Sequence, residues 1–173
     1  SWGGINALVH ATLPDAQVQP RALVLEDPVL LLAADPAPYL PAFTAGVGVP
    51  RDALVAEMSA ANPRWHECDV WWKAEAWQQV RRSAIEGFFV DNAAINVVDR
   101  LRQLTLPTQI LVADRSQGGI WLAEHIPLVQ GVIPACVSLE VLAGSGHNIH
   151  RDSFIPFTMT LGVFVRQFLK AAR

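Results

Sequence analysis

Charged side chains are scarce in this sequence: they make up 17% of its 173 residues, against 51% that are apolar. A soluble domain usually carries about a quarter of charged residues. The apolar excess favours a parallel sheet covered on both faces, or a chain that buries surface against a partner. The net charge is −3 and Lys and Arg form no run. A nucleic-acid-binding surface needs clustered basic residues, so that class of function is excluded.

Long hydrophobic runs are also absent. The richest one, residues 29–34, is too short to cross a bilayer, so no membrane partner is expected. The two cysteines, Cys68 and Cys136, lie far apart and outside any metal-type spacing. We therefore expect packed free thiols rather than a zinc site. No signal peptide is visible, and a cytoplasmic location is favoured.

Three short apolar runs, bounded by Pro, Gly or Asp, have the composition of buried strands. They cover residues 22–25, 109–113 and 137–142. Helical patterns separate and flank them, over residues 5–12, 91–104, 121–125 and 155–171. Such alternation is typical of an open parallel sheet, so the predicted fold class is α/β.

The stretch 36–87 interrupts this rhythm because it carries no strand signal. It starts with three closely spaced prolines and continues with helical segments rich in aromatic residues. We interpret it as a helical insertion between two segments of the core, 1–35 and 88–173.

A serine followed by small residues opens the chain, as Ser1-Trp2-Gly3-Gly4, and a helical pattern follows at once. Small residues allow a sharp turn that leaves the serine hydroxyl exposed. The next backbone N–H, that of Trp2, can then face a developing oxyanion. Ser1 is thus the candidate nucleophile, and the Trp2 N–H is the candidate oxyanion donor.

A histidine follows the third predicted strand, in the glycine-rich run 143–147. From such a loop an imidazole can reach a serine near the middle of the sheet, as a general base must. His147 is therefore the candidate base. His150 lies three residues farther on, but no carboxylate or cysteine stands at a convincing spacing for a two-histidine metal site.

Two carboxylates at strand ends are candidates for the acid that orients His147. Asp114 follows the second predicted strand and Asp27 follows the first. Both lie where a parallel sheet presents its ligand-binding edge, and either fits the order serine, acid, histidine. Asp114 is preferred and Asp27 is the alternative. Each also fits a helix cap or turn, where Asp is common.

In this order the motifs resemble the C-terminal two-thirds of an α/β-hydrolase-fold protein, starting at the nucleophile serine. Residues 1–4 are similar to the second half of the nucleophile elbow, and 23–28 to strand six and its exit. Residues 106–112 resemble the start of strand seven, and 146–152 the catalytic histidine loop.

The resemblance implies parallel strands six to eight with flanking helices, and a helical cap formed by the insertion. It also implies a Ser-His-Asp triad that cleaves a carbonyl, ester-type bond through an acyl-enzyme, with no cofactor and no metal. In the family the acid often lies farther past strand seven than Asp114 does. That spot holds Ser116 here, and some members place the acid after strand six, so Asp27 stays open.

Four tryptophans are candidates for lining a substrate pocket: Trp2 beside the nucleophile, and Trp71, Trp72 and Trp77 in the cap. Residues 71 and 72 cannot face the same way on a helix, and packing of the cap explains these side chains equally well. If they line the pocket, the small-molecule substrate is apolar.

A sheet that began at strand six would expose an apolar edge with unpaired backbone groups. We therefore expect an N-terminal polypeptide with strands one to five to stay bound non-covalently. A chain starting at a nucleophilic serine can arise by autoproteolysis through an N–O acyl shift, by external cleavage, or as a chosen boundary. Two other functions stay open: an N-terminal-nucleophile amidase that uses the Ser1 amino group as base, and a non-catalytic ligand binder.

Overall fold

The structure is a computed structural model that describes residues 1–171. The chain forms two compact units: one combines Ser1–Leu31 with the chain from Asn96 onward, and the other is Leu32–Ile95. The last two residues of the predicted core segment 88–173 lie outside the described residues.

The first unit contains a parallel sheet of β1 (Leu23–Glu26), β2 (Thr108–Ala113) and β3 (Val137–Leu142), in that spatial order. Every residue of the central strand β2 is buried, as expected for a strand with neighbours on both sides and helices on both faces. The α/β class predicted from the sequence is confirmed, with strand ends within one residue of the expected ones.

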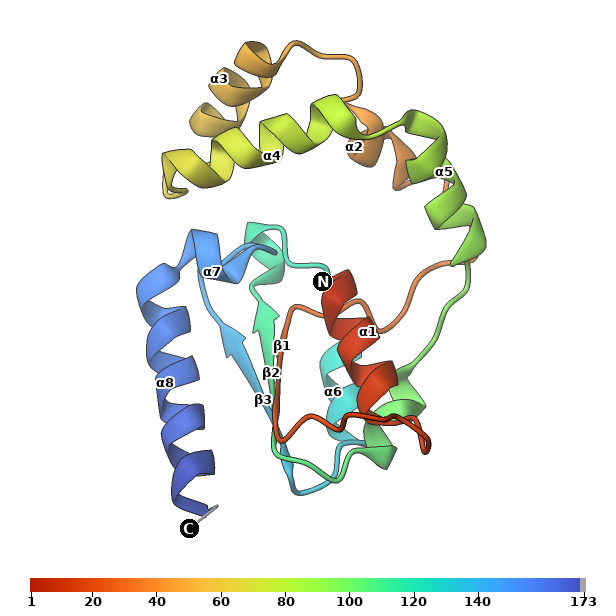
Figure 1. Ribbon diagram of the computed structural model, residues 1–173, viewed down its shortest axis with the longest axis vertical. Helices are drawn as coiled ribbons and strands as arrows, with labels where there is room; N and C mark the ends of the chain where they lie inside the picture. Colours follow the sequence, from red (N-terminus) through yellow and green to blue (C-terminus); the bar gives the residue numbers. More distant parts are fainter. Residues whose placement is uncertain (172–173) are drawn as a thin grey trace. The chain divides into compact units, whose positions relative to one another are not determined.

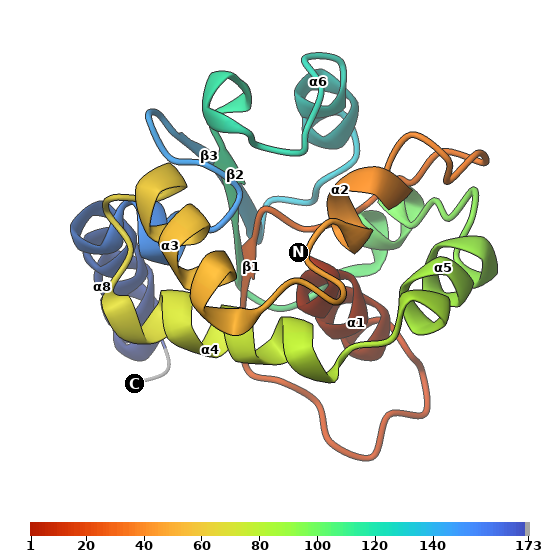
Figure 2. The same ribbon diagram turned by 90° about the horizontal axis from the view of Figure 1, so that it is seen from above.

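Helices cover this sheet on both faces (Figures 1 and 2). One face carries α1 (Trp2–Ala11), η1 (Val98–Gln103) and α6 (His125–Gln130), and the other carries α7 (Ile149–Asp152) and α8 (Phe154–Ala171). Side chains alternate between faces along a strand. The register pairs Glu26 with Leu111 and Ala113 with Leu142. These four strand residues therefore point to the face of α7 and α8. On that face, the three apolar ones form a buried cluster with Ile149 of α7.

The prediction of one helix over 91–104 is wrong. Helix α5 (Arg82–Asp91) ends at its start, and Ala94 then adopts a positive φ of 58° that no α-helix contains. The chain continues through an antiparallel bridge of Asn96 to Leu31 before η1 begins. The Asn96 side chain accepts a hydrogen bond from the Val98 N–H at 3.1 Å. Asparagine bonds its neighbouring backbone in this way at helix starts and turns, and here that chemistry overrides the apolar periodicity.

The prediction of a helix at 121–125 is also wrong, because α6 begins where that segment ends. Trp121 is buried outside any helix, and its Nε1 donates to the carbonyl of Pro28 at 2.9 Å. A contact across 93 residues fixes this segment, so its local pattern does not decide its structure.

The second unit, Leu32–Ile95, consists of α2 (Leu40–Thr44), α3 (Arg51–Ala61), α4 (Glu67–Gln79) and α5. The predicted insertion 36–87 lies inside its bounds. Helices α3 and α4 are in contact, and their buried residues are Leu54, Val70 and Ala74. Phe89 of α5 is buried against two rings, Tyr39 at 6.0 Å and Phe43 at 4.8 Å between centroids. Among the described residues, no helix is long and apolar enough to cross a membrane.

The two glycines at the start of α1 have opposite packing, which gives a matched pair of substitutions. A Cβ at Gly4 would lie 2.8 Å from the Cβ of Pro28, whereas a Cβ at Gly3 would meet nothing within 4 Å. We expect Gly4→Ala to destabilise the fold by about 1–3 kcal/mol through overpacking. Gly3→Ala should be neutral or stabilising by up to about 1 kcal/mol, because alanine suits a helix better. Urea unfolding measures both, and equal effects would contradict this packing.

Candidate active site

The carboxyl ends of the three parallel strands meet at one edge of the sheet, and the start of α1 lies there too (Figure 1). Ser1 precedes α1, and its amino nitrogen donates to the carbonyl of Glu26, the last residue of β1, at 2.6 Å. The Ser1 carbonyl accepts from the N–H of Val29 at 3.4 Å. The backbone of Ser1 thus forms hydrogen bonds with one residue before Asp27 and one after it, Glu26 and Val29.

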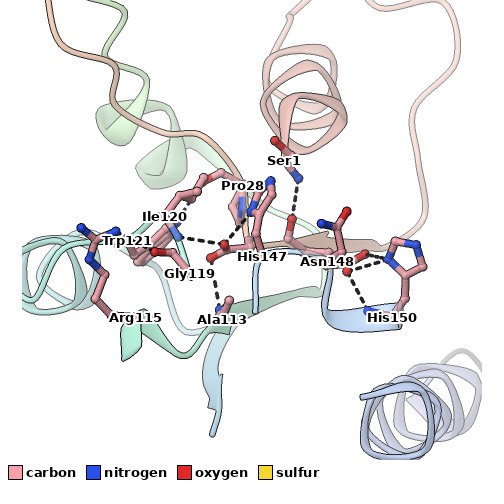
Figure 3. Close-up of polar contacts among 12 residues, drawn as sticks. Ser1, Pro28, Ala113, Arg115, Gly119, Ile120, Trp121, His147, Asn148 and His150 are labelled. Carbon is pink, nitrogen blue, oxygen red and sulfur yellow. Dashed lines mark hydrogen bonds and ion pairs between the residues drawn. The ribbon is translucent and has the colours of Figure 1, made fainter. Parts of the chain in front are cut away.

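Asp27 is fully buried and holds His147: its Oδ2 lies 2.7 Å from the imidazole Nδ1 (Figure 3). The same carboxylate accepts backbone hydrogen bonds from Ala113 at Oδ1 and Ile120 at Oδ2, both at 3.1 Å. A carboxylate is an acceptor, so the shared proton belongs to Nδ1. The Nε2 of the neutral imidazole is then left as an acceptor, which is the tautomer that a general base needs.

The backbone at Asp27 has a positive φ of 37°, and its N–H donates to the carbonyl of Leu111 at 2.7 Å. Among residues other than glycine, Asp and Asn tolerate this conformation best. The chain therefore leaves β1 while still bonded to β2, and the turn brings the carboxylate under the histidine loop.

Asp114, which the sequence ranked first as the acid, has other partners. Its Oδ1 accepts from the N–H and the hydroxyl of Ser116, at 2.9 and 2.7 Å, and its Oδ2 accepts from the N–H of Gly144 at 2.9 Å. The hydrogen bonds from Gly144 and then Ser116 lower the pKa of Asp114 below its ordinary value. Asp114 thus caps η2 (Arg115–Gln117) and ties the loop after β3 to it, while Asp27, the alternative acid, holds His147.

A second carboxylate–histidine pair lies beside the first and was not expected from the sequence. The Nδ1 of His150 lies 2.7 and 3.0 Å from the two carboxylate oxygens of Glu26. The backbone N–H of His150 also donates to Oε1 of Glu26, at 2.9 Å. The available signal was the sequence Glu26-Asp27 facing two histidines three residues apart. Among the described residues, no group of three or more His, Cys, Asp or Glu side chains could hold a metal ion.

The tryptophans predicted to line a pocket belong to different units. Trp2 is half-buried at the start of α1, where the helix N-terminus favours developing negative charge. In the second unit, Trp71 and Trp72 are exposed and in edge-to-face contact, with centroids 4.6 Å apart. Trp77 packs so closely on Gly46 that a Cβ there would lie 2.6 Å from its ring. Their contact with a substrate stays a prediction.

The amino group of Ser1 bears on the amidase alternative. Burial lowers the pKa of this amino group below its ordinary value, and the negative charges of Glu26 and Asp27 partly oppose that shift. Although the residue as a whole is exposed, its amino nitrogen faces the carbonyl of Glu26 and is partly buried there. A lowered pKa increases the neutral fraction that could act as a base near pH 7.

Removal of the buried carboxylate should cost stability. Asp27→Ala leaves the N–H groups of Ala113 and Ile120 without their acceptor, and each unsatisfied group costs about 1–3 kcal/mol. Asp27→Asn should cost less, because its amide oxygen still accepts and asparagine tolerates the positive φ. The free energies of unfolding in urea measure the difference, and equal stability of Asp27→Ala and the unsubstituted protein would refute the network.

Comparison with known proteins finds no matching family model and no matching curated protein. Solved structures do match. An N-formylmaleamic acid deformylase from Pseudomonas putida S16 has a TM-score of 0.65 at 22% identity, covering 93% of this chain and 63% of that one. An esterase from Exiguobacterium antarcticum has a TM-score of 0.66 at 18% identity, covering 94% and 63%. The thioesterase domain from the curacin biosynthetic pathway has a TM-score of 0.64 at 15% identity, covering 94% and 64%. This chain therefore spans less than two-thirds of the length of each.

Proposed function

We propose, from the premise that this chain has the α/β-hydrolase fold, that it carries the catalytic triad of a serine hydrolase. Ser1 is the nucleophile, His147 the general base and Asp27 the acid. The observation that carries the proposal is the 2.7 Å contact of His147 with a fully buried carboxylate, next to the residue that binds Ser1. Ser1 and His147 thus bind two consecutive residues at the end of β1, Glu26 and Asp27.

The mechanism follows from these roles. The Nε2 of His147 takes the proton from the Ser1 hydroxyl while the serine oxygen attacks the substrate carbonyl carbon. Asp27 holds the imidazole in the required tautomer and stabilises the imidazolium that forms. The N–H of Trp2 binds the oxyanion. His147 then protonates the leaving group, and afterwards it activates the water that releases the acyl group from Ser1.

We propose an ester-type bond in a small apolar substrate. The support is Trp2, a half-buried aromatic residue that immediately follows the nucleophile, because apolar and aromatic side chains predominate in small-molecule sites. The names of the structural neighbours include a deformylase, an esterase and a thioesterase. Substrates of all three classes present a carbonyl carbon, which is the electrophile that this triad requires.

We propose further that an N-terminal polypeptide with the remaining strands pairs with the open edge of β1. Leu23 and Asp27 direct their N–H groups to the segment of β2, so the backbone groups of Val24 and Glu26 face away from it. The Glu26 carbonyl on that side accepts from Ser1, as in a parallel ladder. We expect native mass spectrometry of the isolated protein to show additional polypeptide that denaturation separates. A chain that stays folded and monomeric by itself would refute the pairing.

The triad predicts a specific pattern of lost activity. His147→Ala and Asp27→Asn should each lower kcat for p-nitrophenyl acetate by about 10²–10⁴-fold, because base catalysis and its tautomer control have that size. Ser1→Ala should abolish covalent labelling by a fluorophosphonate probe. Asp114→Asn is the matched control: it also changes a carboxylate at a strand end, but one that does not hold His147, so it should keep most of the activity.

Other results of the same assays would contradict the triad. If His147→Ala stays active while Ser1→Ala is dead, the N-terminal-nucleophile mechanism is favoured, and the lowered pKa of the Ser1 amino group is the observation that supports it. If the unsubstituted protein takes no label on Ser1, it is a ligand binder. If Asp114→Asn loses as much activity as Asp27→Asn, the assignment of the acid fails.

A further inference from the structure

Glu26 contacts both the proposed nucleophile, Ser1, and the loop that carries the proposed base. Its backbone carbonyl binds the amino nitrogen of Ser1 at 2.6 Å, and its carboxylate binds His150 through three contacts of 2.7 to 3.0 Å. The triad does not use that carboxylate. Figure 3 shows His147 and His150 on one short stretch of chain, and dashed lines mark the contacts of each imidazole with a carboxylate, Asp27 for His147 and Glu26 for His150.

The two pairs hold this stretch from two sides. Consecutive residues at the end of β1 direct their side chains differently: Glu26, in register with Leu111, points to the face of α7, and Asp27 turns beneath His147. Between the two histidines, Ile149 is fully buried in the apolar cluster of that face. A single hydrogen bond fixes one distance but permits rotation about it. Three anchors spread over residues 147–150 also fix the direction of the imidazole.

We infer that Glu26 and His150 form a positioning pair that keeps the Nε2 of His147 aimed at the Ser1 hydroxyl, an inference that rests on the proposed function. Neither residue touches the reacting atoms. The pair acts through the backbone of α7, whose first turn contains His150. Its side chains are 24% and 41% exposed, so water replaces the lost contacts when one partner is removed. Loss of the pair therefore disturbs alignment more than stability.

The test asks whether a glutamine at position 26, which keeps one side-chain oxygen as an acceptor, restores the activity that an alanine removes. Oε1 of Glu26 accepts both the N–H and the Nδ1–H of His150, and a glutamine carries an oxygen at that position with two lone pairs. We expect Glu26→Ala to lower kcat about 10–100-fold at unchanged KM, because small misplacements of a catalytic group have effects of that size. Glu26→Gln should restore most of kcat. The urea midpoint of both variants should stay close to that of the unsubstituted protein.

Two further variants complete the design. His150→Ala should lower kcat as Glu26→Ala does, and the double variant should lose no more than either single one, since both remove the same contact. Asp99→Ala is the matched control, because it removes an exposed carboxylate from the 3.3 Å ion pair with Arg102 in the same unit. It should leave kcat unchanged.

The outcomes separate this inference from the function on which it rests. If His147→Ala is inactive but Glu26→Ala keeps its full kcat, the triad stands and the positioning role is refuted. If Glu26→Gln is as impaired as Glu26→Ala, the carboxylate acts through its charge, and positioning is again refuted. If His147→Ala keeps its activity, the proposed function fails and the positioning role fails with it.

Discussion

The buried carboxylate of Asp27 is the contact on which this edge of the sheet depends. It joins three segments that are distant in sequence: the end of β2 through Ala113, the segment before α6 through Ile120, and the loop after β3 through His147. A buried carboxylate is tolerated where donors surround it, and three are present here. The positive φ at this residue turns the chain beneath the loop, and this turn places the carboxylate where it contacts His147.

Because side chains alternate at the end of β1, its two acidic residues bind different histidines. Asp27 takes the histidine proposed as base, and Glu26 takes the one that follows on α7. The nucleophile is bound through backbone groups of the same strand end, at Glu26 and Val29. Two members of the proposed triad are therefore positioned by four consecutive residues, Glu26 to Val29, and the third, His147, is held by the side chain of Asp27.

The sequence predicted those features that depend on burial and failed where single polar contacts decide. The central strand β2 was found because its residues 110–113 are all apolar and buried, which leaves a short apolar run in the sequence. The order of the two candidate acids was misjudged because both follow strands. Ser116, two residues after Asp114, was the local sign of a capping turn. What sets Asp27 apart, its bonds to Ala113 and Ile120, spans 86 and 93 residues and leaves no local pattern.

The arrangement also explains where precision is most needed. Ser1 and Asp27 move together if the end of β1 moves, because hydrogen bonds join the Ser1 backbone to Glu26 and Val29, on either side of Asp27. The histidine loop is held to this stretch through side chains and packing instead. Four contacts that fix this loop have been described: the Asp27 pair, the Glu26 pair, the burial of Ile149 and the hydrogen bond from the Gly144 N–H to Asp114. A fifth is the close approach at Gly146, where a Cβ would lie 2.6 Å from the carbonyl of Gln117. The loop is thus pressed against the segment after β2 as well. An acid placed after β2, as first expected, would lie outside the stretch that binds the nucleophile, and two members of the triad rather than one would need this support from side chains and packing.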